Sequence, residues 1–122
     1  KNPLYKSFDY AFEGIFSSVK KERNMKIHLG FIIAVVVSGI FFKISRSEWI
    51  VCLLLFAIVG SLELVNTAIE ATVDLVTEEK RPLAKLAKDA AAGAVLFSAI
   101  IAAVIGLIIF LPRGLEFVQH WL

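Results

Sequence analysis

The sequence predicts an all-α integral membrane protein with one domain over residues 1–122: an N-terminal amphipathic surface helix followed by three transmembrane helices. Hydrophobic residues make up 58% of the chain and the mean hydropathy is +0.78, well above an ordinary soluble domain. A chain of 122 residues cannot hide that much apolar surface in one core. Lysine and arginine also concentrate before the first apolar run and between the last two, as in membrane proteins with a fixed orientation.

The first element is a helix over about residues 4–22. At 100° per residue its apolar side chains fall within about 120° of arc, while Lys6, Asp9, Glu13 and Lys20 lie on the other face. We expect this helix to lie on the cytoplasmic membrane surface. The apolar side chains are Leu4, Tyr5, Phe8, Phe12, Ile15, Phe16 and Val19.

Three spans follow, over about residues 27–44, 48–76 and 86–112. The first has an uncharged run of only residues 29–42, but Lys26 and Lys43 flank it and can reach the two interfaces. A polar turn over residues 43–48 separates it from the second span. The third is uncharged over residues 90–112, long enough to cross the hydrocarbon core. We expect Pro112 to end that helix, because proline lacks the N–H that continues it.

The distribution of lysine and arginine sets the orientation in the membrane. Ten cations should lie on the cytoplasmic side, which puts the N-terminus inside and the C-terminus outside a plasma membrane protein that crosses several times. Six precede the first span (Lys1, Lys6, Lys20, Lys21, Arg23 and Lys26) and four follow the second (Lys80, Arg81, Lys85 and Lys88), against three on the other side (Lys43, Arg46 and Arg113).

Small residues recur every fourth position on the third span, at Ala90, Ala94, Ser98, Ala102 and Gly106. Such a row lets another helix approach closely, within or between subunits.

Several functional classes are excluded by composition and motif. A net charge of +2 without basic and aromatic interleaving gives no support for nucleic-acid binding. Neither a Walker A sequence, nor soluble-kinase loop signatures, nor H-E-x-x-H is present. The two histidines are far apart in sequence, so for any phosphate chemistry we expect Mg²⁺ held by carboxylates.

The second span carries a polar face. Glu63, Asn66, Thr67, Glu70 and Asp74 fall within about 100° of one another on a helix. If the span begins near the outer boundary at Trp49, Glu63 lies roughly 21 Å along it, close to the cytoplasmic headgroup level. This layout suits a reaction between a lipid headgroup and a water-soluble substrate better than a through-going ion path.

Two further charged clusters lie on the same side of the membrane. Residues 78–89 mix carboxylates with four cations that could hold phosphate oxygens, or that could serve only the positive-inside bias. Residues 20–28 place Glu22 among cations just before the first span. The residues alone leave three classes open: an enzyme, an ion- or proton-coupled membrane protein using the carboxylates as a relay, and a structural membrane subunit.

The segment "ELVNTAIEATVD", Glu63 to Asp74, resembles the signature of the prokaryotic diacylglycerol kinase family, small integral-membrane lipid kinases unrelated to soluble kinases. The segment "LAKDAAAGAV", Leu86 to Val95, is similar to the second block of that family, and Glu22 stands at its N-terminal metal-binding glutamate. "NTAIEATVDL", "PLAKLAKDAAAGAV", "IGLIIFLP" and "ERN" are most similar to the Gram-positive undecaprenol kinase branch. The resemblance covers almost the whole chain.

The resemblance implies a homotrimer of three-span subunits with active sites at subunit boundaries. It implies a kinase that uses ATP and Mg²⁺ to phosphorylate the hydroxyl of undecaprenol, with diacylglycerol as the alternative acceptor. Glu63 would be the general base, Asn66 would position the reacting groups, and Glu22 and Glu70 would hold Mg²⁺. The nucleotide would contact Tyr10, Glu22, Glu70, Glu79, Lys80, Arg81, Lys88 and Asp89, with Asp74 in support.

Overall fold

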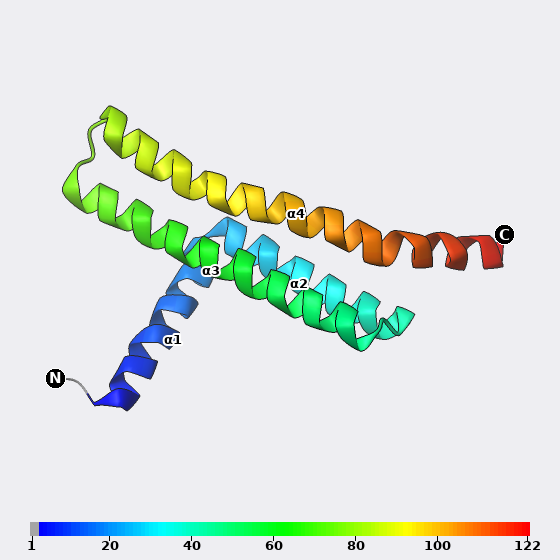
Figure 1. The fold of residues 1–122 in the computed structure, drawn as a ribbon. Coiled ribbons are helices and arrows are strands. Elements are labelled where there is room, and N and C mark those ends of the chain that lie inside the picture. Colours follow the sequence, from blue (N-terminus) through cyan, green and yellow to red (C-terminus); the bar gives the residue numbers. More distant parts are fainter. Residues whose placement is uncertain (1–2) are drawn as a thin grey trace.

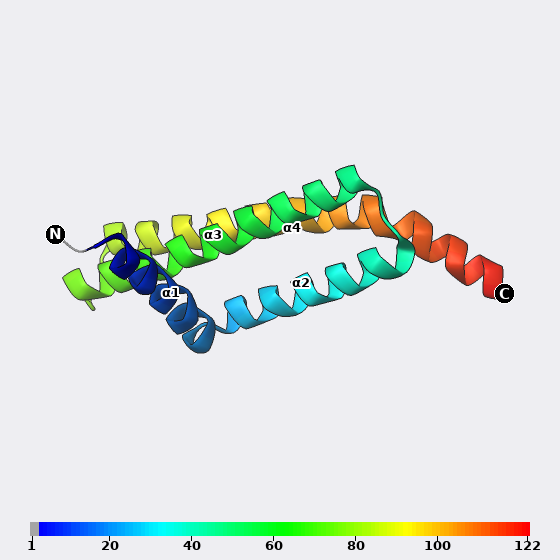
Figure 2. The same cartoon turned by 90° about the horizontal axis from the view of Figure 1, so that it is seen from below.

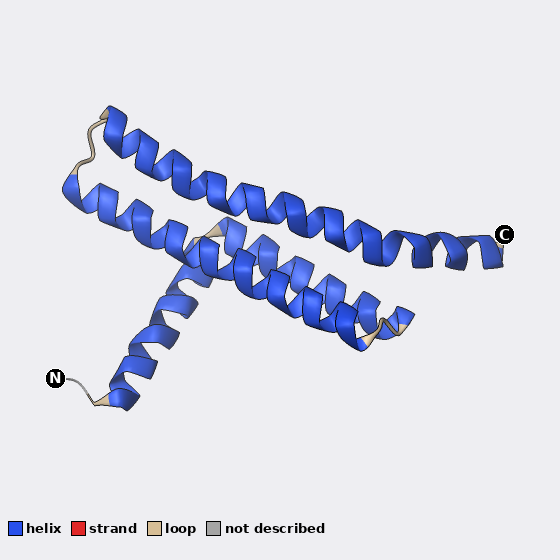
Figure 3. Ribbon diagram, viewed as in Figure 1, coloured by secondary structure: helices blue, strands red, loops and turns tan. Residues whose placement is uncertain are grey.

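The computed structural model describes residues 3–122, so Lys1, one of the six N-terminal cations, lies outside the described residues. Within this part the chain is helical throughout, with short connections (Figures 1 and 3). The helices are α1 (Leu4–Lys21), α2 (Arg23–Phe42), α3 (Arg46–Val76) and α4 (Pro82–Trp121). The last three are long and apolar enough to cross a membrane.

The α1 helix ends at a break rather than at a loop. Glu22 has extended backbone angles (φ −98°, ψ 121°) and separates α1 from α2. In Figure 1, α1 leaves the other helices at an angle, and its N-terminal end is well separated from α3 and α4. Its large apolar side chains, such as Phe8 and Phe12, remain exposed because no helix of this chain covers them.

The turn between α2 and α3 is set by local chemistry. Lys43 adopts a left-handed conformation (φ 54°) directly after α2. Ser45 then caps α3: its Oγ accepts from the Glu48 N–H at 3.2 Å, and the Glu48 carboxylate accepts from the Ser45 N–H at 2.8 Å. This reciprocal pair satisfies two of the free donors at the helix start. The polar turn is therefore shorter than residues 43–48, since α3 begins at Arg46.

The α3 and α4 helices pack side by side over most of their length, antiparallel (Figures 1 and 2). Arg113 pairs with Glu48 at one end, and Lys88 pairs with Asp74 at the other. Near the Glu48 end, Ile44, Cys52 and Ile109 form a small buried core. These contacts fix the register of the two helices, that is, which residues of α4 lie opposite each residue of α3.

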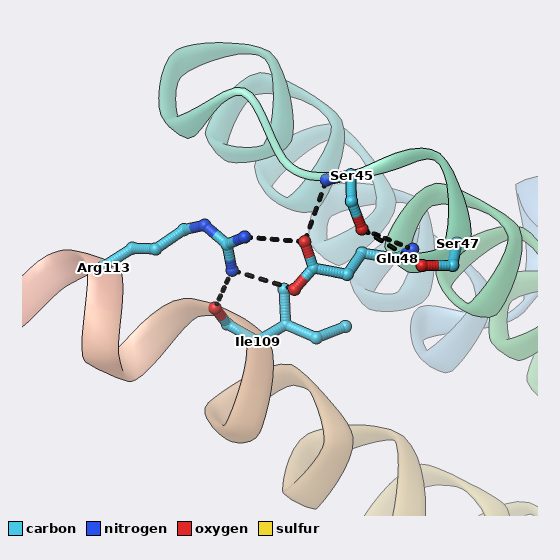
Figure 4. A network of polar contacts seen from close by, with 5 residues as sticks. All are labelled: Ser45, Ser47, Glu48, Ile109 and Arg113. Atoms are coloured by element: carbon cyan, nitrogen blue, oxygen red, sulfur yellow. Dashed lines mark hydrogen bonds and ion pairs between the residues drawn. The ribbon is translucent and has the colours of Figure 1, made fainter.

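The prediction that Pro112 ends the third span's helix is wrong, because α4 continues to Trp121. Pro112 does remove one backbone donor, and in Figure 2 the C-terminal part of α4 leaves the line of the rest. Two contacts hold the continuation. The Arg113 guanidinium donates to the Ile109 carbonyl at 2.7 Å and to both Glu48 oxygens (Figure 4). The Phe117 ring also packs edge-on against Phe41 of α2, with ring centroids 5.4 Å apart.

The row of small residues on α4 divides between two environments. Ser98, Ala102 and Gly106 are half-buried, whereas Ala90 and Ala94 are exposed. Close helix approach within the chain therefore uses only the second half of the row.

Candidate active site

Glu63 is the one buried carboxylate among the described residues. It is 7% exposed, and its Oε2 has no hydrogen-bond partner. The level of Glu63 follows from the ion pair at the start of α3: Glu63 lies 15 residues after Glu48, and Ser98 lies 15 residues before Arg113. Small side chains of α4 thus lie across from Glu63, leaving the carboxylate next to apolar helix surfaces rather than a cation.

Asn66 and Glu70 form the next layer toward the α3 C-terminus. The Asn66 Nδ2 donates to Glu70 Oε1 at 2.9 Å, which fixes the amide and leaves Asn66 Oδ1 buried without a partner. Thr67, on the same face, donates its hydroxyl to the Glu63 backbone carbonyl at 3.1 Å, so this hydroxyl has its hydrogen-bond partner within the helix. Two buried acceptors, on Glu63 and Asn66, therefore remain open one turn apart.

Asp74 and Lys88 join the two helices where the face becomes exposed. Lys88 Nζ lies 2.5 Å from Asp74 Oδ1, with side chains 39% and 57% exposed. Lys85 pairs in turn with Asp89 along α4. Exposed pairs of this kind exchange readily with other anions or cations, because their net stabilisation is small. The structure thus places Lys88 beside the polar face of α3 and leaves Asp89 on the outer side of α4.

His28 was not among the candidate residues from sequence. Its ring packs against Gly60, where a Cβ would lie 3.4 Å from Nε2, and that nitrogen has no partner. Gly60 precedes Glu63 by three residues, so His28 enters the site on the face of α3 that carries the carboxylates. The sequence feature that could have indicated His28 is Gly60, one turn before Glu63, because a glycine there leaves space for a side chain of α2.

Glu22, at the break directly before α2, lies at the level of this layer. Gly39 lies against Trp49 and Gly60 against His28, so the two helices run antiparallel with a fixed register. His28 lies opposite Gly60, and in antiparallel helices six residues before one lies opposite six residues after the other. Glu22 therefore lies at the level of Asn66, one turn from Glu70. Glu22 is half-buried. No group of three or more His, Cys, Asp or Glu side chains converges within residues 3–122.

The residues present fit a magnesium ion better than a metal that needs a full protein cage. Mg²⁺ is commonly held by one or two carboxylates, with water and substrate phosphates completing its shell. Glu70 engages only Oε1 with Asn66, so Oε2 remains available.

The loop between α3 and α4 borders an apolar groove of about 300 Å³. Arg81 lines this groove, and its Nε donates to Glu79 Oε2 at 3.2 Å. Lys80 is exposed in the same loop. The rest of the groove is formed by Thr72, Val73, Val76, Thr77, Leu83, Ala84 and Ala87.

Tyr10 is a second predicted residue, besides Asp89, that lies off the polar face of α3. It is 55% exposed on α1, about 18 Å along that helix from Glu22. The N-terminal part of α1 diverges from α3 and α4 (Figure 1).

Comparison with known proteins identifies the family. The family model described as prokaryotic diacylglycerol kinase matches residues 9–110. An undecaprenol kinase of Bacillus subtilis is 49% identical over 112 residues, covering 92% of this chain and 91% of that relative. A diacylglycerol kinase of Synechocystis sp. is 40% identical over 110 residues, covering 89% of this chain but only 63% of that relative. The protein therefore belongs to the prokaryotic diacylglycerol kinase family and is a lipid kinase.

Proposed function

We propose that the protein is an ATP- and Mg²⁺-dependent membrane kinase that converts undecaprenol to undecaprenyl phosphate. One observation carries the proposal: the buried, unpaired carboxylate of Glu63 lies in an apolar span beside two other unpaired polar atoms, on His28 and Asn66. Buried polar atoms normally have partners, so these three favour a polar ligand inside an apolar site. A hydroxyl at the end of a long hydrocarbon has this combination. The greater identity to the undecaprenol kinase supports that acceptor.

Glu63 acts on the acceptor. Its open oxygen accepts the proton of the lipid hydroxyl as the hydroxyl oxygen attacks the γ-phosphorus of ATP. The bond from that phosphorus to the bridging oxygen of ATP breaks, and ADP leaves. Asn66 and His28 hold the acceptor, because their unpaired atoms open onto the same face of α3.

The donor lies on the cytoplasmic side of Glu63. Glu22 and Glu70 hold Mg²⁺, which would neutralise charge on the transferring phosphate. Lys88 exchanges its contact with Asp74 for the phosphate oxygens, and Asp74 keeps the ammonium near the site. Glu79, Lys80, Arg81 and Asp89 contact the rest of the nucleotide, and the groove beside Arg81 accommodates its base.

The membrane arrangement follows from the charges. The site and the N-terminus face the cytoplasm, where ATP is present, and the C-terminus lies on the other side of the plasma membrane. The exposed apolar face of α1 lies on the cytoplasmic membrane surface. The proposed homotrimer brings Tyr10 to the site of a neighbouring subunit, since α1 diverges from its own.

The test supplies ATP with undecaprenol or diacylglycerol in detergent micelles and compares rates of lipid phosphorylation. Faster phosphoryl transfer to undecaprenol supports the proposal. Faster transfer to diacylglycerol would show that diacylglycerol is the acceptor instead. If neither lipid is phosphorylated with Mg²⁺ present, both acceptors proposed here are wrong.

A further inference from the structure

The segment of α4 beyond Pro112 is a second amphipathic surface. At 100° per residue, Leu115, Phe117, Val118, Trp121 and Leu122 fall within about 160° of arc. The polar residues occupy a separate arc of about 120°: Arg113, Glu116, Gln119 and His120. A helix with divided faces of this kind is typical of a membrane interface.

The apolar face of this segment is only partly covered by the chain. Phe117 packs on Phe41 and Phe42 at the end of α2 but remains 43% exposed, and Trp121 is 72% exposed. Trp121 stacks at an angle on Phe117, with ring centroids 6.1 Å apart. The aromatic surface is thus continuous from the end of α2 to the end of α4, at the membrane boundary where α2 ends and α3 begins.

Position along α4 favours lipid over a protein partner. The segment continues directly from residues 90–112, the uncharged part of the span, so its apolar face extends the lipid-facing surface. Tryptophan and tyrosine are enriched where a span meets the headgroups, because an amphipathic ring suits that layer. The C-terminal part of α4 also turns away from the line of the rest of the helix (Figure 2).

We propose that residues 113–122 form an interfacial anchor that inserts Phe117 and Trp121 among the lipid headgroups and upper acyl chains at this boundary. The bidentate pair of Arg113 with Glu48 fixes the anchor to the start of α3, with nitrogen–oxygen distances of 2.7 and 2.9 Å (Figure 4). The anchor lies at the end of the bundle opposite the kinase site.

Tryptophan fluorescence in phosphatidylcholine vesicles tests the anchor without using activity. The Trp49→Phe variant leaves Trp121 as the only tryptophan. We expect a blue-shifted emission, strong quenching by lipids brominated near the headgroup, weaker quenching by lipids brominated near the chain ends, and little quenching by aqueous iodide.

A matched control places the probe on the polar arc. In a Trp49→Phe, Trp121→Phe background, Gln119→Trp should be quenched by iodide and poorly by brominated lipid. If the replacement of Trp49, which packs on Gly39, prevents folding, the Trp121→Phe variant of the otherwise native chain replaces it. The emission of the native chain minus that of this variant then reports Trp121, and we expect shallow bromine to quench this difference more strongly than deep bromine or iodide does.

Three results would overturn the anchor. Iodide quenching of Trp121 like that of a free tryptophan derivative would place the segment in water. Stronger quenching by deep bromine would place it across the membrane. Insensitivity to iodide and to bromine at every depth would place it against a second copy of the chain.

Discussion

Glu63 shows how the cost of one buried group indicates its role. Its carboxylate is almost completely buried, and one oxygen has neither a cation nor a donor within reach. Leaving a buried polar atom unpaired costs free energy, so such a group rarely persists for stability alone. Thr67, one turn further along the same face, instead donates its hydroxyl to the Glu63 backbone carbonyl. The contrast favours a ligand as the missing partner of Glu63.

Replacing Glu63 with glutamine should remove catalysis and leave the fold intact. Glutamine keeps the shape of the side chain but cannot accept the hydroxyl proton, so kcat should fall by ~10²–10⁴-fold. Circular dichroism and ATP binding should be unchanged, and the melting temperature should not fall, since a buried charge without a partner is removed. Glu116→Gln, on an exposed part of α4, is the control. Full activity of Glu63→Gln would exclude the general-base role.

Replacing Glu70 with glutamine should weaken metal binding. The amide oxygen of glutamine can still accept from Asn66 Nδ2, so the local structure is preserved while the negative charge is lost. The Mg²⁺ concentration for half-maximal rate should rise ~10-fold or more. The measurement is a Mg²⁺ titration at saturating ATP, with exposed Glu78→Gln as the control. An unchanged titration curve would remove Glu70 from the metal ligands.

At the scale of elements, the two glycine contacts between α2 and α3 set the register that carries His28 and Glu22 to the site. Gly39 allows the ring of Trp49 to approach where a side chain would otherwise stand, and Gly60 does the same for His28. Close approach needs glycine here for space rather than for backbone conformation, because neither residue has a positive φ.

A Gly39→Ala substitution should therefore destabilise the protein. Its Cβ would lie 2.6 Å from Trp49 Cη2, and the rigid indole cannot yield without shifting α3. Overpacking of this kind costs about 1–3 kcal/mol. Gly30→Ala on the same helix has open space around its Cβ and should be neutral or slightly stabilising. Unfolding in a denaturing detergent, followed by circular dichroism, compares the two; equal stability would contradict this packing.

The pair of Arg113 with Glu48 should control the order of the C-terminal helix. An Arg113→Ala variant loses the contacts to the Glu48 carboxylate and the Ile109 carbonyl. Amide hydrogen exchange over residues 114–121 should accelerate, while the kinase rate stays within ~2-fold, because Glu63 lies about 22 Å away along α3. Arg113→Lys should give partial protection, since an ammonium lacks the bidentate geometry. Unchanged exchange in Arg113→Ala would show that aromatic packing alone holds the segment.

At the scale of the whole molecule, one chain builds only a small core, around Ile44, Cys52 and Ile109. Among the described residues no large side chain is completely buried, and long stretches of α2 and α4 are exposed. In a membrane protein this surface is available to lipid and to other copies of the chain. The exposed Tyr10 and the exposed half of the small-residue row on α4 are the features that an assembly would cover.

If each active site takes Glu63 from one subunit and Tyr10 from its neighbour, two impaired variants should restore activity when mixed. We expect Glu63→Gln and Tyr10→Ala chains, each impaired alone, to regain part of the native rate after they are unfolded and refolded together in micelles, because some mixed sites then contain both native residues. The control mixes the same proteins without unfolding, so that subunits do not exchange. An absence of recovery in refolded samples shown to contain both chains would place both residues in one subunit's site.

Much of the site could be anticipated because its residues lie on one helix. The spacing of Glu63, Asn66 and Glu70 fixes their common face at 3.6 residues per turn, and the structure adds the hydrogen bond between Asn66 and Glu70. His28 could not be found in this way. Its place depends on Gly60, 32 residues later in the chain, and no local pattern specifies that contact.

The hydrophobic content, the three long apolar helices and the polar face of α3 are encoded locally, since composition and helical period depend on neighbouring residues. Three other features are not encoded locally. They are the burial of Glu63, the register that places Glu22 at the level of Asn66, and the helical course of α4 beyond Pro112. Proline removes one backbone hydrogen bond wherever it stands. Whether the helix continues depends on partners outside it: here Glu48 holds Arg113 and α2 packs on Phe117, and only long-range packing brings those groups together.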